Sequence, residues 1–157
     1  MSADNGKTVK SEESIFLDVR DLTVQYTSMG SVIHAVNGIT FQLKKGETLA
    51  LVGETGAGKT SIAKAILRIL PDVSAKSKGT VIFNNTDLMQ MKEKEMQKIR
   101  GHKISMIFQD PMTALNPTMR VGKQISEVIS AHRSISTEEA VAEGKKMLEM
   151  VGIPAER

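Results

Sequence analysis

A glycine-rich segment, residues 53–60, constrains the fold of this chain more than any other part of its sequence. It reads Gly-Glu-Thr-Gly-Ala-Gly-Lys-Thr and fits the pattern G-x-x-x-x-G-K-[ST] at every fixed position. A continuous apolar run, residues 48–52, precedes the segment, and residues 59–70 repeat apolar side chains at helical spacing after it. The sequence therefore predicts a strand buried on both faces, then a tight loop, then a helix.

The chemistry of this loop predicts a polyphosphate ligand. Successive backbone N–H groups in a glycine-rich loop converge on phosphate oxygens, and the N-terminus of the following helix adds further N–H groups and partial positive charge. Lys59 supplies a point charge for the β- and γ-phosphates, and the Thr60 hydroxyl is a hard oxygen ligand for Mg²⁺. The loop residues predicted to surround the phosphates are Gly53, Glu54, Thr55, Gly56, Ala57 and Gly58.

Composition excludes several other classes of function. The net charge of +3 comes from basic residues scattered along the chain, which argues against a nucleic-acid partner. There is no cysteine, so disulfides and thiolate metal sites are excluded. No apolar run approaches the roughly 18 residues that span a bilayer, and residues 1–14 form a polar stretch predicted to be a disordered tail. Direct membrane insertion is not expected.

The remaining pattern predicts strands before helices. Strands are expected at residues 15–26, 32–43 and 79–83, and Asn84-Asn85 suits a turn because Asn tolerates positive φ. A polar helix at residues 92–100 and a buried strand at residues 104–108 follow.

Two amphipathic helices are predicted after residue 120, with apolar stripes that begin at Val121 and Ala140. Ser136 and Glu139 form a capping box at the start of the second, and Gly152 follows its end.

Longer stretches carry a family resemblance. The segment VNGITFQLKKGETLALVGETGAGKTSIAKAILRIL resembles the opening of ABC-transporter nucleotide-binding domains. The segment ISMIFQDPMTALNPTMRVGKQISE is similar to the glutamine-loop region of the ATPases of oligopeptide and dipeptide importers. The resemblance covers about residues 15–157 and implies an α/β fold, a P-loop NTPase of ABC ATPase type. It would combine an antiparallel β region and a parallel-sheet nucleotide core, about residues 15–110, with the start of an α-helical subdomain, about residues 111–157.

The resemblance also implies roles for individual residues. Tyr26, the only tyrosine, is placed where the family has an aromatic residue that stacks on adenine, and this role needs a ring but no hydroxyl. Ser61 resembles the family's second hydroxyl, which faces the α-phosphate. Gln109 matches the glutamine that helps bind Mg²⁺ and the attacking water, and the loop after it contacts membrane subunits in the family.

These features together imply an ATP-binding subunit that uses ATP and Mg²⁺ to power peptide import. Its partners would be transmembrane permease subunits and a second ATP-binding subunit, at the cytoplasmic face of the membrane; the cargo, dipeptide, oligopeptide or nickel, stays open. The phosphate loop alone also allows a kinase or a GTPase of another P-loop family, although no Asn-Lys-x-Asp guanine-binding motif is present. A non-catalytic nucleotide-binding remnant is a further alternative.

Three family features do not occur in the 157 residues: an LSGGQ-type signature, an apolar strand ending in Asp-Glu, and the switch histidine that follows it. Asp87 and Asp110 do not stand in such a context. The resemblance therefore indicates an N-terminal fragment, truncated within the helical subdomain. The chain alone is predicted to bind ATP without turning it over.

Overall fold

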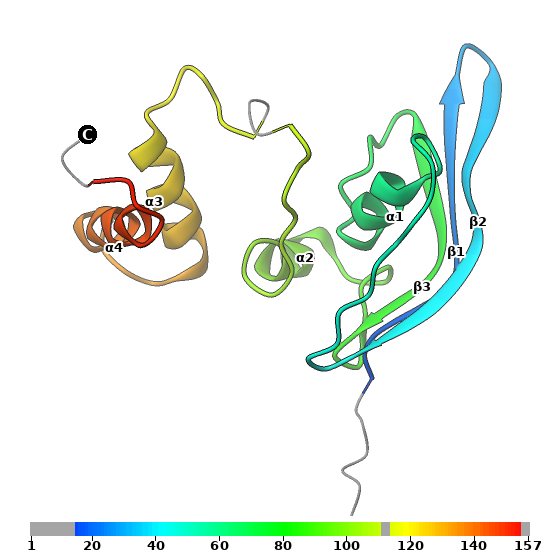
Figure 1. Cartoon of the computed structure of the whole chain (residues 1–157), viewed down its shortest axis with the longest axis horizontal. Helices are drawn as coiled ribbons and strands as arrows, with labels where there is room; N and C mark the ends of the chain where they lie inside the picture. The colour runs from blue at the N-terminus through cyan, green and yellow to red at the C-terminus, as the bar shows by residue number, and fades with distance from the viewer. Residues whose placement is uncertain (1–14, 111–113, 155–157) are drawn as a thin grey trace, which may run out of the picture. The chain divides into compact units, whose positions relative to one another are not determined.

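The computed structural model describes residues 15–110 and 114–154 of the chain (Figure 1). These residues form two compact units, the first ending at Glu93 and the second beginning at Lys94. Each unit is described by itself below. The predicted tail at residues 1–14 lies outside the described residues.

The first unit is built on a four-stranded antiparallel sheet. The long strands β1, Ile15–Ser28, and β2, Ser31–Lys44, confirm the two strands expected at residues 15–26 and 32–43, and they pair as an antiparallel hairpin. Strand β3, Ala75–Phe83, pairs with the other edge of β1, and the short β4, Thr86–Asp87, completes the order β2-β1-β3-β4. Asn84 and Asn85 connect β3 to β4 with φ angles of 47° and 64°, which confirms the predicted turn.

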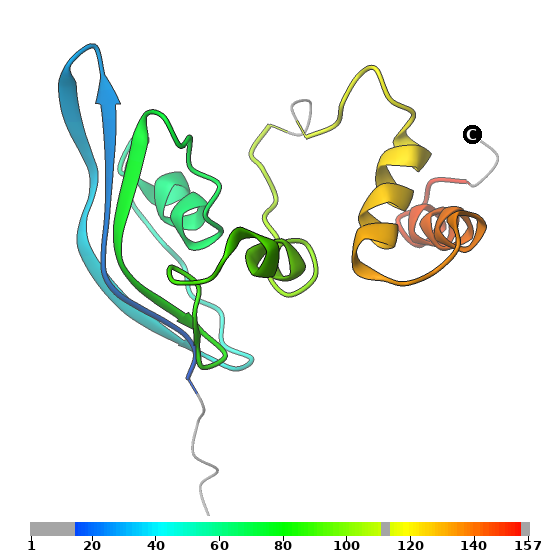
Figure 2. The same cartoon turned by 180° about the vertical axis from the view of Figure 1, so that it is seen from behind.

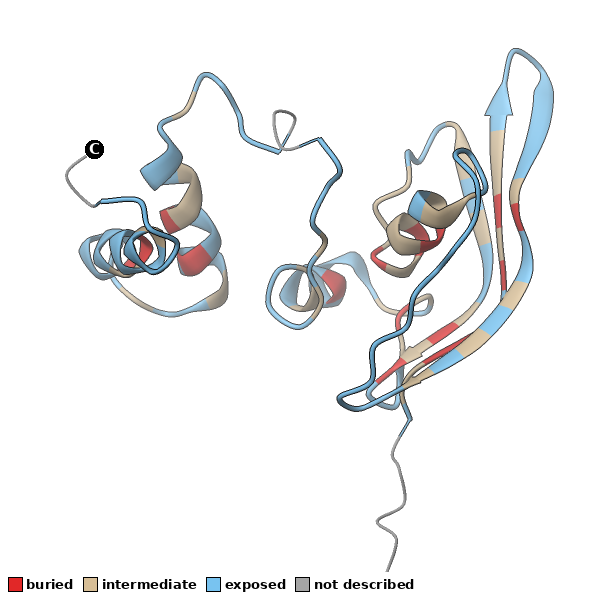
Figure 3. Cartoon of the chain, in the orientation of Figure 1, coloured by how far each residue is buried: buried red, intermediate tan, exposed pale blue. Residues whose placement is uncertain are grey.

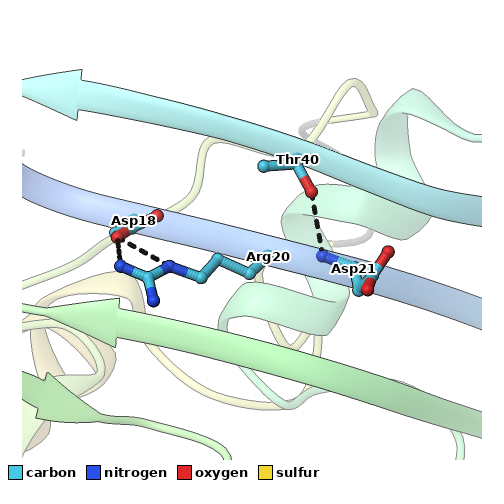
Figure 4. A network of polar contacts seen from close by, with 4 residues as sticks. All are labelled: Asp18, Arg20, Asp21 and Thr40. Carbon is cyan, nitrogen blue, oxygen red and sulfur yellow. Dashed lines mark hydrogen bonds and ion pairs between the residues drawn. The ribbon is translucent and has the colours of Figure 1, made fainter.

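Strand β1 carries an irregularity in its pairing with both neighbours between Val19 and Val24. There the backbone N–H of Asp21 donates to the Thr40 hydroxyl at 3.0 Å (Figure 4). Three residues earlier, the buried Asp18 carboxylate accepts hydrogen bonds from Arg20 Nε at 3.0 Å and Nη2 at 2.5 Å; Asp18 and Arg20, two positions apart, share one face of the strand. These bonds lower the pKa of Asp18, although burial acts in the opposite direction.

Helix α1, Lys59–Ile66, ends earlier than the predicted residue 70. Arg68 adopts a left-handed conformation with φ 52°, and the N–H groups of Arg68 and Ile69 close the helix on the carbonyls of Ala65 and Lys64. This is a Schellman ending with arginine in the place that glycine usually takes. The Arg68 guanidinium donates to the carbonyls of Leu88 at 3.0 Å and Met91 at 2.6 Å.

Helix α1 lies against one face of the sheet in both views (Figures 1 and 2). It buries Ile62 and Ala65, and in the first unit the segments coloured as buried in Figure 3 lie on this helix, on the long strands and on the chain next to them. Burial of apolar surface here is the main favourable contribution to the folding of the unit. The buried apolar side chains of the first unit are Val19, Leu22, Val24, Val36, Ile62, Ala65, Leu67, Val81, Phe83 and Leu88.

Two predicted strands of the parallel nucleotide core are not formed. Residues 48–52 and 105–108 are irregular, and Val52 and Ile107 are 94% and 98% exposed. A strand buried on both faces needs neighbouring strands for its backbone groups. Within residues 15–110 and 114–154, no strand pairs with either segment, and only Ile104 forms an isolated bridge, with Arg100. Both segments are apolar, but an apolar composition alone is not enough to form a strand.

In the second unit, helices α3, Val121–His132, and α4, Thr137–Met150, pack against each other. Gly144 permits close approach, because a Cβ at this position would lie 3.1 Å from the Ile125 side chain. The predicted capping box of Ser136 and Glu139 is confirmed, with both of its hydrogen bonds present.

The polar helix expected at residues 92–100 is α2, Glu93–Ile99, which straddles the boundary between the units in sequence. Of the helices that the structure describes, none has both the length and the apolar character required to cross a bilayer.

Candidate nucleotide-binding site

The glycine-rich loop leads directly into α1, as the sequence predicts. The Ala57 N–H donates to the Glu54 carbonyl at 3.1 Å and forms a tight turn, and the first helical bond runs from Ile62 N–H to Gly58 O at 3.0 Å. Gly58 caps the helix with φ 85°. A Cβ on Gly58 would lie 2.3 Å from the carbonyl oxygen of Ala35 in β2, so only glycine allows the loop to touch the sheet here.

Lys59, the first residue of α1, turns its ammonium back over the loop. Its Nζ donates to the carbonyls of Gly53 at 2.5 Å and Glu54 at 2.6 Å. Among the described side chains, no carboxylate forms an ion pair with it. The ammonium therefore satisfies two of its three donors with neutral carbonyls, and its positive charge is not neutralised.

The N-terminus of α1 adds to this positive character. No acidic residue occupies its first turn, where Asp or Glu commonly offsets the helix dipole. Within the described parts of the chain, the backbone N–H groups of Thr55, Gly56 and Thr60 donate to no backbone carbonyl. A cation and N–H donors without a backbone acceptor thus lie within the six residues from Thr55 to Thr60, which is a donor set suited to an anion.

Two further predicted site residues contact each other. The Tyr26 hydroxyl, from the central strand β1, lies 3.0 Å from the Ser61 hydroxyl in the first turn of α1. Both side chains are partly buried. The structure therefore brings Tyr26 beside the helix that carries Lys59 and Thr60, although 35 residues separate it from Ser61 in sequence.

Gln109 belongs to the second unit, in an irregular and exposed segment. Its expected contribution to Mg²⁺ binding stays a prediction. Thr60, the other predicted Mg²⁺ ligand, is exposed on the first turn of α1. Residues 111–113 of the loop after Gln109, which include Met112, lie outside the described residues.

The sequence patterns did not identify two residues that have a structural role at these loops. Ala35 acts through its main-chain carbonyl, for which a side-chain pattern carries no signal. Gln124 of α3 accepts from Asn116 N–H and donates to the carbonyls of Asn116 and Met119, each at 2.9 Å, and so holds the loop before α3. Gln124 is a polar residue among the apolar residues of a helical stripe, and this was the sequence signal that could have identified it. Across residues 15–110 and 114–154, no cluster of three His, Asp or Glu side chains could hold a metal by itself.

Comparison with known protein families is decisive at this point, because the ABC transporter family model matches residues 36–157. The chain belongs to the ABC transporter family. It is 49% identical over 139 residues to the oligopeptide transport ATP-binding protein OppD of Bacillus subtilis, a match that covers 88% of this chain and 39% of that protein. The dipeptide transport ATP-binding protein DppD of the same organism is also 49% identical, with 88% and 42% covered.

The oligopeptide transport ATP-binding protein OppD of Escherichia coli is 43% identical over 141 residues, with 90% of this chain and 42% of that protein covered. The chain thus spans about two fifths of the length of these relatives. A solved dimeric ATP-binding cassette in a post-hydrolysis state, bound to ADP and Pi, superposes with a TM-score of 0.69 over 85% of this chain and 56% of that one, at 20% identity. The predicted ABC ATPase fold class is confirmed.

Proposed function

We propose that this ABC-family chain binds Mg·ATP through residues 53–61, as the nucleotide-binding part of a subunit that powers peptide import. The observation that carries the proposal is the Lys59 ammonium, which has no carboxylate partner among the described residues and lies at a helix N-terminus without acidic neighbours. Such a cation attracts the β- and γ-phosphates of a nucleotide. The names of the relatives, oligopeptide and dipeptide transport ATP-binding proteins, support the substrate class.

The donor set of the loop fits a nucleotide with a bound magnesium ion. The N–H groups of Thr55, Gly56 and Thr60 are available to phosphate oxygens. The exposed Thr60 hydroxyl would be the ligand for Mg²⁺ on the first turn of α1. The ion, when bound, would supply positive charge that offsets the negative charge developing on the phosphates. Tyr26 would stack on the adenine ring from the strand beside α1.

The proposal also includes the partners implied by the relatives' names. The intact protein would act with transmembrane permease subunits and a second ATP-binding subunit at the cytoplasmic face of the membrane. In this arrangement the exposed loop before α3, held by Gln124, would contact the permease. Leu115 in this loop is 46% exposed and offers an apolar contact.

Calorimetric titration of the purified chain with Mg·ATP tests the proposal. Lys59→Ala should weaken binding by at least ~2 kcal/mol, or roughly thirtyfold, because it removes a charged partner from a phosphate. Lys64→Ala is the matched control: it removes the same charge from the last turn of the same helix and should change affinity by less than about twofold. Equal ATP affinity in wild type and Lys59→Ala would refute the proposal. Circular dichroism establishes that each variant is folded.

A further inference from the structure

Two hydroxyl groups at the proposed nucleotide site are hydrogen-bonded to each other. Tyr26 Oη and Ser61 Oγ lie 3.0 Å apart, and either oxygen can be the donor. A ring that only stacks on a base needs no hydroxyl, and a serine that only contacts phosphate needs no tyrosine. The contact therefore calls for an explanation that neither separate role supplies.

The sheet fixes the backbone of Tyr26. It lies in the central strand β1, where its backbone pairs with Ile33 of β2 and with Ala75 of β3. The next residue, Thr27, donates its N–H to the Ser74 carbonyl at 2.7 Å. Because neighbouring strands fix both edges, the backbone from which the phenol projects is set by the sheet and not by the loop.

Ser61 has a competing partner if the phenol is removed. A serine hydroxyl within a helix readily bonds the carbonyl four residues earlier, which for Ser61 is Ala57 in the phosphate loop. A hydroxyl bonded in this way points its proton back along its own helix. In the structure the Ser61 hydroxyl is hydrogen-bonded to the Tyr26 phenol instead. When the phenol donates, the serine proton is available for an acceptor in front of the helix N-terminus.

We propose that the Tyr26 hydroxyl is a positioning group that orients the Ser61 hydroxyl toward a phosphate oxygen of the bound nucleotide. This inference rests on the proposed function. Binding of an anion selects the polarity in which Tyr26 O–H donates to Ser61 Oγ and Ser61 O–H donates to phosphate. Hydrogen bonds in such a chain polarise and strengthen one another, and the bond to the charged oxygen is the strong member. The phenol thereby links the base side of the site to the phosphate side.

The test is a double-mutant cycle on Mg·ATP affinity with Tyr26→Phe, Ser61→Ala and the combined variant. Tyr26→Phe should weaken binding about three- to tenfold, the effect of one lost hydrogen bond. Ser61→Ala should lose at least as much, because it removes the bond to the charged oxygen itself, and the combined variant should lose little more than Ser61→Ala alone. Unchanged affinity in Tyr26→Phe, or losses that multiply in the combined variant, would overturn the inference.

Two further measurements separate positioning from stacking and from a general structural effect. Inorganic tripolyphosphate has no base, so a role in stacking alone predicts equal tripolyphosphate affinity for Tyr26→Phe and wild type; the inference predicts the same three- to tenfold loss, about one lost hydrogen bond. Ser61→Thr keeps a hydroxyl and should restore binding to within about twofold of wild type, the range expected when the hydrogen bond survives. Failure of either expectation contradicts the inference.

Thr40→Val provides the control for loss of a hydroxyl elsewhere in the same sheet. Thr40 accepts from the Asp21 N–H, away from the phosphate loop, so its loss should leave ATP affinity unchanged even if it lowers stability (Figure 4). Lys59→Ala in the same assay distinguishes the two levels of failure. If Lys59→Ala binds ATP like wild type, the proposed function is wrong. If it loses binding while the cycle is additive, only the Tyr26–Ser61 inference is wrong.

Discussion

Substitution of Gly58 by alanine should disrupt the packing of the phosphate loop against β2 much more than the same change at Gly56. Both glycines are left-handed, with φ angles of 85° and 87°, so both substitutions cost ~1–2 kcal/mol in backbone conformation. At Gly56 the new Cβ meets no atom within 4 Å. At Gly58 it would lie 2.3 Å from the Ala35 carbonyl oxygen and 3.3 Å from Val36 Cγ2.

The clash at Gly58 cannot be relieved by a side-chain rotation, because its main partner is a backbone oxygen of β2. Overpacking in tight regions costs ~1–3 kcal/mol. The total for Gly58→Ala is therefore ~2–5 kcal/mol, against ~1–2 kcal/mol for Gly56→Ala. This is a large part of the ~5–15 kcal/mol by which domains are typically stable.

Urea unfolding followed by far-UV circular dichroism measures both variants and wild type, with linear extrapolation to water. Gly56→Ala serves as the control for backbone conformation, so the difference between the variants isolates the contact with Ala35. ATP affinity should follow the same order, because retreat of the loop from β2 displaces the residues that follow Gly58. Equal destabilisation by the two substitutions would show that the Ala35 contact has no energetic weight.

The remaining predictions concern turnover and pH. The isolated chain should release phosphate from ATP at a rate near background, because the 157 residues hold no apolar strand ending in Asp-Glu, the segment expected to supply the general base. Loss of a general base alone typically costs 10²–10⁴-fold, and steady turnover near 1 s⁻¹ that Lys59→Ala abolishes would contradict this. The second concerns Asp18, whose pKa is lowered by hydrogen bonds from Arg20, so the ionised carboxylate stabilises the fold at neutral pH and loses this effect as the pH falls through its folded-state pKa. Asp18→Asn should flatten the acid side of the stability profile, measured by urea unfolding between about pH 5 and about pH 2, whereas parallel profiles would mean that the ion pair has no role.

Local patterns predicted the parts of this fold that depend on neighbours in sequence. Strand β1 follows from alternation, the Asn84-Asn85 turn from the tolerance of Asn for positive φ, and the start of α4 from the capping box. The loop into α1 follows from the glycine motif. Each of these features is decided within a few residues.

Features that depend on distant partners were not predictable in the same way. Residues 48–52 have the composition of a buried strand, but a strand exists only when another strand satisfies its backbone groups. The early end of α1 was hidden because arginine, and not glycine, takes the left-handed position, with support from the Leu88 and Met91 carbonyls. The contact between Tyr26 and Ser61 joins segments 35 residues apart, which no spacing rule anticipates.

The hydrogen bonds of the Arg68 guanidinium have a consequence for how the phosphate-binding helix opens. The guanidinium joins the C-terminal end of α1 to the chain that follows β4, through the carbonyls of Leu88 and Met91. Fraying of the last turn of α1 must therefore also break the hydrogen bonds that hold the segment after β4. Short helices usually unravel independently from their ends. Here α1 and the segment after β4 are coupled, so the helix that carries Lys59 belongs to a larger cooperative unit than its eight residues suggest.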